Sequence, residues 1–216
     1  SFKFDTVIFD EASQLTGENA IGSCVRAKSI IVCGDQEQLP PTSFFNTEIN
    51  DEDDLEYDVF ESILDEARAM LPSIMLKWHY RSKNEALIAY SNKEIYHDLL
   101  TFKEPYLANE FEGLSYSYVS DGYFDRGKSR VNIKEAKKTL ELILNHATTM
   151  KNKSLGVVTF NIAMQNLIIE LVNQERIYNK ELDEFLSNEN IDPFFVKNLE
   201  TVQGDERDHI ILTIGY

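Results

Sequence analysis

Short apolar runs of strand character alternate along this chain with segments of helical periodicity, and this alternation limits the possible folds most strongly. The predicted strands are residues 6–10, 29–35, 73–78, 114–120, 155–160, 194–199 and 209–216. The predicted helices are residues 60–70, 133–150 and 163–177, with a fourth that begins at Lys83 behind a Ser82–Glu85 capping box. Strands that alternate with helices form a mainly parallel sheet covered by helices, so the sequence predicts an α/β fold.

The chain is strongly acidic. Its 216 residues include 21 Lys and Arg and 37 Asp and Glu, which gives a formal net charge of −16 at pH 7. A protein that coats nucleic acid carries a basic stripe, so this charge argues against that class without excluding a local basic groove. Much of the acid lies in residues 47–58, which we predict to be an exposed loop of unassigned role.

The sequence lacks the marks of a membrane or secreted protein. No apolar run is long enough to span a bilayer and no signal-peptide pattern occurs, so we expect a cytoplasmic protein without a membrane partner. Cys24 and Cys33 lie in apolar surroundings without metal-ligand spacing, which favours buried thiols in a reducing compartment. Because both ends of the sequence lie on apolar strands, we expect the chain to be a piece of a longer polypeptide.

Carboxylates follow two successive predicted strands. The first strand leads directly into Asp10 and Glu11, and the second ends at Gly34 and Asp35. The carboxyl ends of parallel strands share one edge of a sheet, where ligands bind in open α/β folds. The sequence therefore predicts three carboxylates along one sheet edge. Taken alone, each strand end is equally well explained by a solvated acidic turn.

Five segments in order resemble the ATP-site motifs of superfamily 1 helicases, which carry two RecA-like domains. The segments are "VIFDEASQL", "CGDQEQLPPT", "LKWHYRS", "VVTFNIAMQ" and "ETVQGDERD". The resemblance covers nearly the whole chain and is closest to the up-frameshift type, above all to large bacterial proteins that join such a core to a nuclease-like region. It implies RecA-like parallel sheets of the P-loop NTPase type: residues 1–72 as the end of a first domain and 73–216 as most of a second.

The resemblance implies ATP and Mg²⁺ as cofactors and gives four residues a role in hydrolysis. Asp10 matches the Walker B carboxylate that holds Mg²⁺ through a water, and Glu11 matches the catalytic base. Gln38 matches the amide that senses the γ-phosphate, and Arg81 an arginine finger from the second domain. The further nucleotide-binding positions that it implies are Gln14, Asp35, Tyr80, Gln203, Gly204 and Glu206.

Several of these further positions have a specific expected role. Tyr80 matches the aromatic ring that stacks on adenine, and Glu206 the carboxylate that accepts a ribose hydroxyl. Gly204 is expected to allow a sharp turn where a side chain would clash. A solvated turn before the last strand remains the alternative for Glu206. His79, beside Arg81, is expected only to pack or to form a local hydrogen bond.

Single-stranded nucleic acid is the partner that the resemblance implies, with DNA favoured over RNA. Thr159, Asn161 and Thr201 are the expected contacts, since hydroxyl and amide groups donate to phosphates without reading sequence. Local satisfaction of these polar groups at strand ends is the alternative. The remaining domains of the parent chain, including a nuclease-like region, are the other expected partners.

Two family motifs are missing from the sequence. The phosphate loop G-x-x-x-x-G-K-[ST] does not occur, and the last motif, which supplies a second arginine, would lie beyond Tyr216. We therefore expect no appreciable ATP hydrolysis by these residues alone. The interval between Arg81 and Gly204 is too short for the large domain that the 3′-to-5′ group inserts there, so we predict 5′-to-3′ movement for the parent protein.

Other classes of protein explain the motifs less well. A phosphatase with an Asp nucleophile, of the haloacid-dehalogenase kind, needs a second Asp two positions after Asp10, where this chain has Ala12. A receiver-like phosphoacceptor domain would be shorter and would carry a Lys at a late strand. A non-catalytic RecA-like scaffold in a defence or repair protein remains the alternative to the motor.

Overall fold

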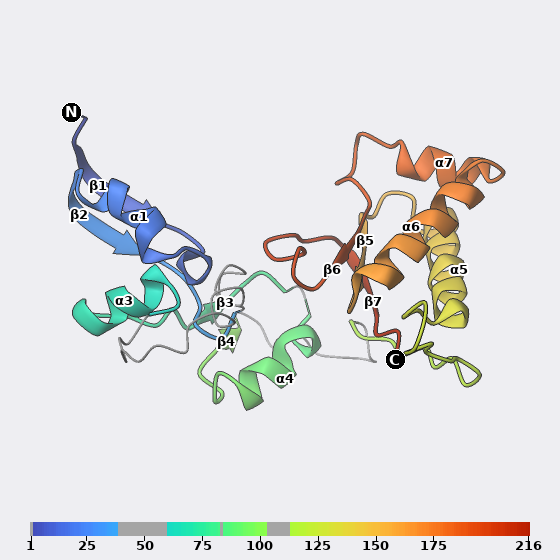
Figure 1. Cartoon of the computed structure of the whole chain (residues 1–216), viewed down its shortest axis with the longest axis horizontal. Helices are drawn as coiled ribbons and strands as arrows, with labels where there is room; N and C mark the ends of the chain where they lie inside the picture. The colour runs from blue at the N-terminus through green and yellow to red at the C-terminus, as the bar shows by residue number, and fades with distance from the viewer. Residues whose placement is uncertain (1, 39–59, 83, 103–112) are drawn as a thin grey trace. The chain divides into compact units, whose positions relative to one another are not determined.

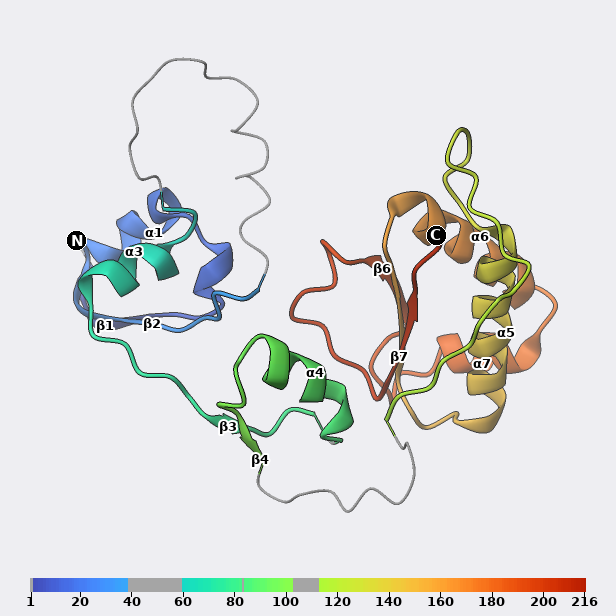
Figure 2. The same cartoon turned by 90° about the horizontal axis from the view of Figure 1, so that it is seen from below.

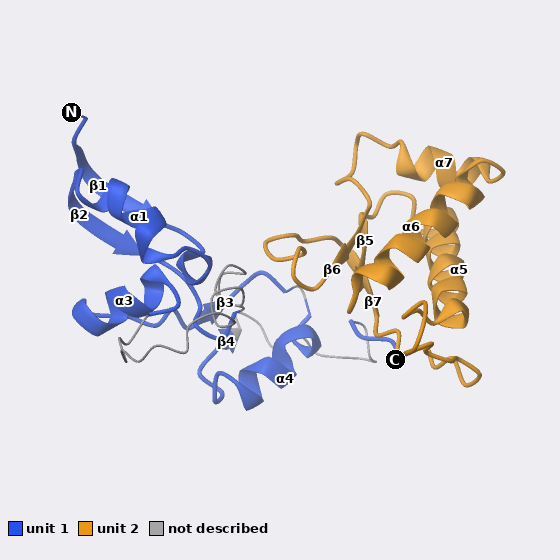
Figure 3. Cartoon of the chain, in the orientation of Figure 1, with its two compact units in different colours: residues 1–116 blue, residues 117–216 orange. Residues whose placement is uncertain are grey.

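The computed structural model describes residues 2–38, 60–82, 84–102 and 113–216. The chain divides into two compact units, residues 1–116 and 117–216 (Figure 3). The predicted boundary between domains 1–72 and 73–216 falls inside the first unit, and that domain assignment stays a prediction. The acidic loop at residues 47–58 lies outside the described residues.

The first sheet of unit 1 is a parallel pair. Strand β1 (Phe4–Phe9) pairs with β2 (Ala27–Val32). The crossover between them contains the short 3₁₀ helix η1 (Ala12–Gln14) and helix α1 (Gly17–Cys24), because parallel strands need a long return connection. Helix α3 (Ile63–Met70) completes this part of unit 1. The apolar core that these elements share contains Phe9, Ala12, Ala20, Ile63 and Leu64.

A second, smaller sheet also belongs to unit 1. Strands β3 (Trp78–His79) and β4 (Thr101–Phe102) are parallel, and helix α4 (Ala86–Glu94) lies between them in the sequence (Figure 1). Helix α4 begins three residues later than predicted from Lys83, which lies outside the described residues. The side chain of Asn84 accepts a hydrogen bond from Ala86 N at 2.9 Å, and this local bond sets the entry into the helix.

Unit 2 contains a three-stranded parallel sheet. Strand β5 (Leu155–Thr159) is central, between β6 (Phe195–Asn198) and β7 (His209–Thr213). Helices α5 (Ile133–Thr149), α6 (Ile162–Arg176) and α7 (Lys180–Leu186) lie together on one side of this sheet (Figure 1). Each helix starts at an asparagine whose side chain accepts a backbone hydrogen bond from the first turn.

The core of unit 2 lies between the sheet and these helices. All five residues of β5 are buried, as expected for the central strand of a covered parallel sheet. Ile143 on α5 and Ile168 on α6 are both fully buried against it. The cluster continues through α7, where Leu182 and Phe185 are also buried.

The α/β class with parallel sheets and flanking helices is confirmed. The strands predicted at residues 155–160, 194–199 and 209–216 correspond to β5, β6 and β7, although β7 ends at Thr213. The strand predicted at residues 114–120 is wrong, because this segment pairs with no strand among the described residues and Tyr118 is 74% exposed. The residue types of this segment favour a strand, but they do not determine whether another strand is placed to pair with it.

Two smaller expectations also need correction. Of the strand predicted at residues 73–78, only the last residue pairs, as the first residue of β3. Helices α1 and α7 were not predicted from the sequence. Cys24 and Cys33 are free thiols, but Cys33 is exposed rather than buried. No described helix is both long enough and apolar enough to cross a membrane.

Candidate functional site

The turns that follow β1 and β2 are in contact. Cys33 N donates to Phe9 O at 2.8 Å, and Cys33 O accepts from Ala12 N at 2.9 Å. A Cβ atom on Gly34 would lie only 3.2 Å from Ala12 N and 3.0 Å from a methyl group of Leu64. Glycine is therefore the residue that lets the second turn approach the first. The predicted convergence of these two strand ends is present in the structure.

Asp10 and Glu11 form the tip of β1, and both are exposed. Glu11 has φ 50° and ψ 41°, in the left-handed region, which costs a residue with a side chain about 1–2 kcal/mol. Glu11 N donates to Asp10 Oδ1 at 3.0 Å. The other oxygen of Asp10 and the carboxylate of Glu11 accept no hydrogen bond from the residues described. A strained turn that presents acceptor oxygens to solvent is typical of a functional site.

Asp35, at the tip of β2, is braced within unit 1. Its Oδ2 accepts from the Tyr96 hydroxyl at 2.5 Å, and its Oδ1 accepts from Glu37 N at 3.1 Å. Burial of the Tyr96 hydroxyl, and then its hydrogen bond to Asp35, raise the pKa of Tyr96 far above its ordinary value. Both oxygens of Asp35 thus hold the turn in place, and a contact between Asp35 and a nucleotide stays a prediction.

Two exposed glutamines flank these carboxylates. Gln14 ends helix η1, and its backbone N donates to Glu11 O at 3.0 Å. Gln38 follows β2, and its backbone N donates to Asp35 O at 3.3 Å. Each amide side chain therefore starts one tight turn away from a carboxylate, within the same edge of the β1–β2 sheet.

Tyr80 and Arg81 follow β3 in unit 1. Tyr80 is 90% exposed, and Arg81 is also exposed. Their turn is held by His79, whose Nε2 accepts from Ser82 N at 3.1 Å. Burial, and then the nearby Arg81 guanidinium, lower the pKa of His79 and favour the neutral imidazole that this bond needs. This is the local role expected for His79, and the approach of Arg81 to a nucleotide stays a prediction.

The carboxyl edge of the unit 2 sheet carries the three expected strand contacts. Thr159 is fully buried, and its hydroxyl donates to Asn161 O at 3.0 Å. Asn161 Oδ1 accepts from Met164 N at 2.8 Å and caps α6, whereas its Nδ2 is enclosed and has no partner among the described residues. Thr201 is exposed, but its hydroxyl donates to Asn198 Oδ1 at 2.7 Å. The local alternative thus accounts for both hydroxyls in this structure.

The loop between β6 and β7 carries Gln203, Gly204 and Glu206. Gly204 has φ 83°, which confirms the sharp turn, but a Cβ there would meet nothing within 4 Å. Backbone conformation rather than a clash is the reason for glycine. Lys197 on β6 forms an ion pair with Asp205, and both side chains are partly buried. This ion pair ties the middle of the loop to the sheet.

Arg207 closes the same loop at its other end. Its Nε and Nη2 donate to Pro193 O at 2.9 and 2.7 Å, and its guanidinium lies 4.7 Å from the centre of the Phe195 ring. The Phe195 ring in turn lies over Gly156, where a Cβ would come within 2.5 Å of it. These contacts hold the loop against β5 and β6.

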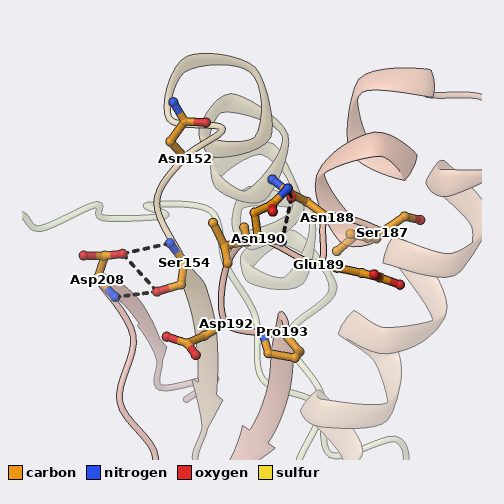
Figure 4. Close-up of a pocket in the computed structure, with 11 residues that line it drawn as sticks. Asn152, Ser154, Ser187, Asn188, Glu189, Asn190, Asp192, Pro193 and Asp208 are labelled. Carbon is orange, nitrogen blue, oxygen red and sulfur yellow. Dashed lines mark hydrogen bonds between the residues drawn. The ribbon is translucent and has the colours of Figure 1, made fainter.

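An open, polar cleft of about 710 Å³ lies at the opposite edge of this sheet. Ser154, Pro193 and Asp208, which precede the three strands, line it (Figure 4). Asp208 Oδ2 accepts from Ser154 N at 3.0 Å and from Ser154 Oγ at 3.1 Å. Glu189 and Asp192 add further carboxylates, which disfavour a phosphate ligand. The cleft is therefore a weaker candidate for a nucleotide than the carboxyl edges.

The residues at the β1 tip suit a hydrated metal ion with a phosphate ligand. Magnesium prefers oxygen ligands and keeps several waters, and the free oxygen of exposed Asp10 offers such a ligand. Glu11 offers a base beside it. The bracing residues Tyr96, Lys197 and Asp205 were not found from the sequence. Tyr96 is 61 positions from Asp35, and no short-range pattern links residues so far apart.

No protein-family model matches the chain. Over 99% of its length, the chain is 35% identical to a Mycoplasma genitalium protein named "uncharacterized ATP-dependent helicase", and 33% identical to a Mycoplasma pneumoniae homolog of that protein. A Methanocaldococcus jannaschii protein, also named an uncharacterized ATP-dependent helicase, is 28% identical over 48% of the chain.

The chain corresponds to only part of each relative. It spans about one-fifth of the length of the two mycoplasma proteins, and 14% of the length of the archaeal one. Over nearly its whole length the chain is therefore similar to part of two proteins that are named ATP-dependent helicases, and its sheets are parallel.

Proposed function

We propose that the chain is part of an ATP-dependent superfamily 1 helicase or translocase of the up-frameshift type. The exposed Asp10–Glu11 tip, with its left-handed Glu11, carries this proposal. The names of the relatives support ATP use and a nucleic-acid substrate. The parent protein would couple ATP hydrolysis to 5′-to-3′ movement on single-stranded nucleic acid, with DNA favoured over RNA.

The proposed chemistry divides between a base and positive charge. Glu11 would orient the attacking water and accept its proton, while the bond from the γ-phosphorus to the leaving oxygen of ADP breaks. Arg81 would neutralise charge on the transferred phosphoryl group, and Gln38 would report its presence. Asp10 would hold Mg²⁺ through water, and the ion when bound neutralises phosphate charge. Tyr80 would stack on the adenine ring.

Unit 2 would position the nucleotide and the strand. Glu206 would accept a ribose hydroxyl, with Gln203 and Gly204 in the same loop, which the Lys197–Asp205 ion pair holds to β6. Of the three expected strand contacts, Asn161 and Thr201 are proposed at this edge, whereas Thr159 is fully buried. Asp35 and Gln14 would act on the nucleotide through the turns that they shape.

The phosphate loop is expected outside these 216 residues, so the proposal concerns the complete polypeptide that carries this sequence. These residues alone are expected to show no appreciable hydrolysis. The other proposed partners are further domains of that polypeptide, including a nuclease-like region.

The test is ATP hydrolysis by the complete polypeptide with Glu11→Gln. We expect a loss of about 10²–10⁴-fold in kcat, because the base is removed while its shape is kept. Glu61→Gln, an exposed carboxylate near α3, is the matched control and should behave as wild type. Absence of magnesium-dependent hydrolysis in the wild-type polypeptide would contradict the motor and favour a scaffold.

A further inference from the structure

A cluster of positive charge lies just before helix α5, in an otherwise acidic chain. Residues 126–130 read Arg-Gly-Lys-Ser-Arg and contain no carboxylate, whereas the whole chain has 37 acidic and 21 basic side chains. We call residues 125–131 the basic loop. No sequence motif or relative assigns it a role.

The basic loop has a defined shape. Asp125 N donates to Val131 O at 3.1 Å, and Arg130 N donates to Asp125 O at 2.9 Å. The carboxylate of Asp125 accepts from Ser129 N at 3.2 Å and from Ser129 Oγ at 3.0 Å. The one carboxylate of the loop is therefore used to close it, which leaves the cations at its tip without an acidic neighbour inside the loop.

The three cations of the loop point to an outside partner. Arg126, Lys128 and Arg130 are exposed, and no ion pair joins them to any part of the chain that the structure describes. Two of the three lysines of α5 behave differently, because Lys134 pairs with Asp121 and Lys138 pairs with Glu141. Uncompensated cations in a protein of net charge −16 are where a polyanion meets the least repulsion.

Aromatic side chains accompany this charge. Tyr123 is 75% exposed, two residues before the loop. Phe124 instead packs on Tyr216 after β7, with ring centres 4.7 Å apart, and fixes the start of the loop to the end of the sheet. An exposed ring beside cations is the arrangement that binds single strands: bases stack on the ring while phosphates meet Lys and Arg.

The basic loop also lies at the same edge of the sheet as Asn161. Asn132, directly after the loop, donates its backbone N–H to Met164 Sδ at 3.2 Å, in the first turn of α6. Glu135 accepts from Oγ1 of Thr213, the last residue of β7, at 2.6 Å and from Gly215 N, just after this strand, at 2.8 Å. In Figure 2 the loop (yellow-green) extends from this end of α5.

We propose that the basic loop and Tyr123 bind single-stranded nucleic acid. Arg126, Lys128 and Arg130 contact successive phosphates, and the Tyr123 ring stacks on a base. This inference rests on the proposed helicase function and adds a binding surface that the motifs do not contain. It predicts a contact that tolerates any sequence, because neither stacking nor phosphate pairing reads base edges.

The test is the affinity of the complete polypeptide for oligodeoxythymidine and for oligouridine, measured by fluorescence anisotropy over a range of salt. Replacing the three cations together, as Arg126→Gln, Lys128→Gln and Arg130→Gln, should weaken binding by about tenfold or more and reduce the salt slope by about 2. Tyr123→Leu should also weaken binding, about fivefold or more, whereas Tyr123→Phe should keep the wild-type affinity. The DNA and RNA arms show which strand is preferred.

A matched triple variant controls for net charge. Lys151→Gln, Lys153→Gln and Lys180→Gln remove the same charge near the C-terminal end of α5 and should leave affinity unchanged beyond the general charge effect. If the wild type binds strands and the two triple variants lose equal affinity, the basic loop has no special role, while the helicase proposal survives. If the wild type binds no strand, both proposals fail. ATP hydrolysis without nucleic acid should be unchanged by either triple variant.

Discussion

The carboxyl edges of the two larger sheets differ in how they use their polar groups. At the β1–β2 edge of unit 1, Asp10 and Glu11 are exposed and Glu11 keeps a strained backbone. At the edge of unit 2, the hydroxyls of Thr159 and Thr201 are bound locally. Carboxylate oxygens that are open to solvent can bind a ligand or act as a base, whereas hydroxyls with local hydrogen bonds mainly support the structure. The first edge is therefore the better candidate for catalysis, and the second for positioning.

The two units also differ in the size of their apolar cores. In unit 1 the largest described cluster has five buried side chains, whereas the cluster of unit 2 has eleven and joins all three helices to the sheet. A larger packed core holds loops more rigidly, because side chains in close-packed interiors cannot shift independently. Unit 2 is thus the better platform for the braced loop between β6 and β7.

The largest expected effect tests whether chemistry belongs to unit 1. Arg81→Ala should lower kcat of the complete polypeptide by about 10³–10⁵-fold, because an arginine finger stabilises charge that develops only in the transition state. Arg81→Lys should recover little of this, since an ammonium lacks the planar fork. Steady-state ATP hydrolysis at saturating strand is the measurement. Arg68→Ala, an exposed arginine of α3, is the control.

A smaller effect of Arg81→Ala would contradict the assignment of catalysis to unit 1. A loss no larger than that of Arg68→Ala would leave Tyr80–Arg81 as a surface aromatic beside a structural arginine. The exposed Asp10–Glu11 tip would then have no assigned cationic counterpart, and the catalytic assignment of unit 1 would fail.

Much of the fold could be predicted from the sequence. The alternating strands and helices predict the parallel α/β class. The positions of Asp10 and Gly34 at two strand ends predict that the two turns lie close together, because strand ends in a parallel sheet share an edge. Buried, regular elements such as β5 have the clearest pattern. The segment around Tyr118 shows the limit, since alternating aromatic residues suit a strand only where a partner strand is available.

The supporting contacts could not be predicted in the same way. Tyr96 reaches Asp35 across 61 positions, and Lys197 meets Asp205 only because a sharp turn at Gly204 folds the loop back. Such pairs depend on tertiary structure, for which one sequence offers no periodic signal. The local hydrogen bond of the Thr159 hydroxyl is predicted only as an alternative to a nucleic-acid contact, since a hydroxyl can bond to either.

The next effect in size tests the difference between the cores. Ile143→Ala should lower the free energy of unfolding of unit 2 by about 2–5 kcal/mol, because Ile143 is fully buried among the helices and the sheet. Ile177→Ala, at a 75% exposed position, should change it by less than about 0.5 kcal/mol. Urea unfolding followed by circular dichroism measures this change.

The same experiment separates the two units. The one tryptophan of the sequence, Trp78, lies in β3 of unit 1. Its fluorescence should therefore report a transition that Ile143→Ala leaves in place, while the dichroism midpoint falls. If both midpoints fell together, the two units would unfold as one. The difference between their cores would then not be a difference in the stability of separate units.

The smallest expected effect is the pH dependence of unit 2. His209 Nδ1 lies 3.3 Å from Nδ1 of the buried His146, and Asp208 and Lys153 are its other charged neighbours. Burial of His209, and then repulsion from His146, lower the pKa of His209 from 6.5, although Asp208 opposes this change. Below about pH 6.5 the unfolded chain therefore takes up a proton that the folded unit resists, so stability should fall as the pH falls.

Thermal unfolding of wild type and His209→Gln between neutral and mildly acidic pH measures this dependence. The variant should show a flatter profile in this window, because it removes the group that resists protonation and the repulsion within the histidine pair. The effect should be small, since His209 as a whole residue is exposed and screening weakens its interactions. Identical slopes for both proteins would show that the pair does not govern the acid sensitivity of unit 2, and would leave the carboxylates of its loops as the groups to examine.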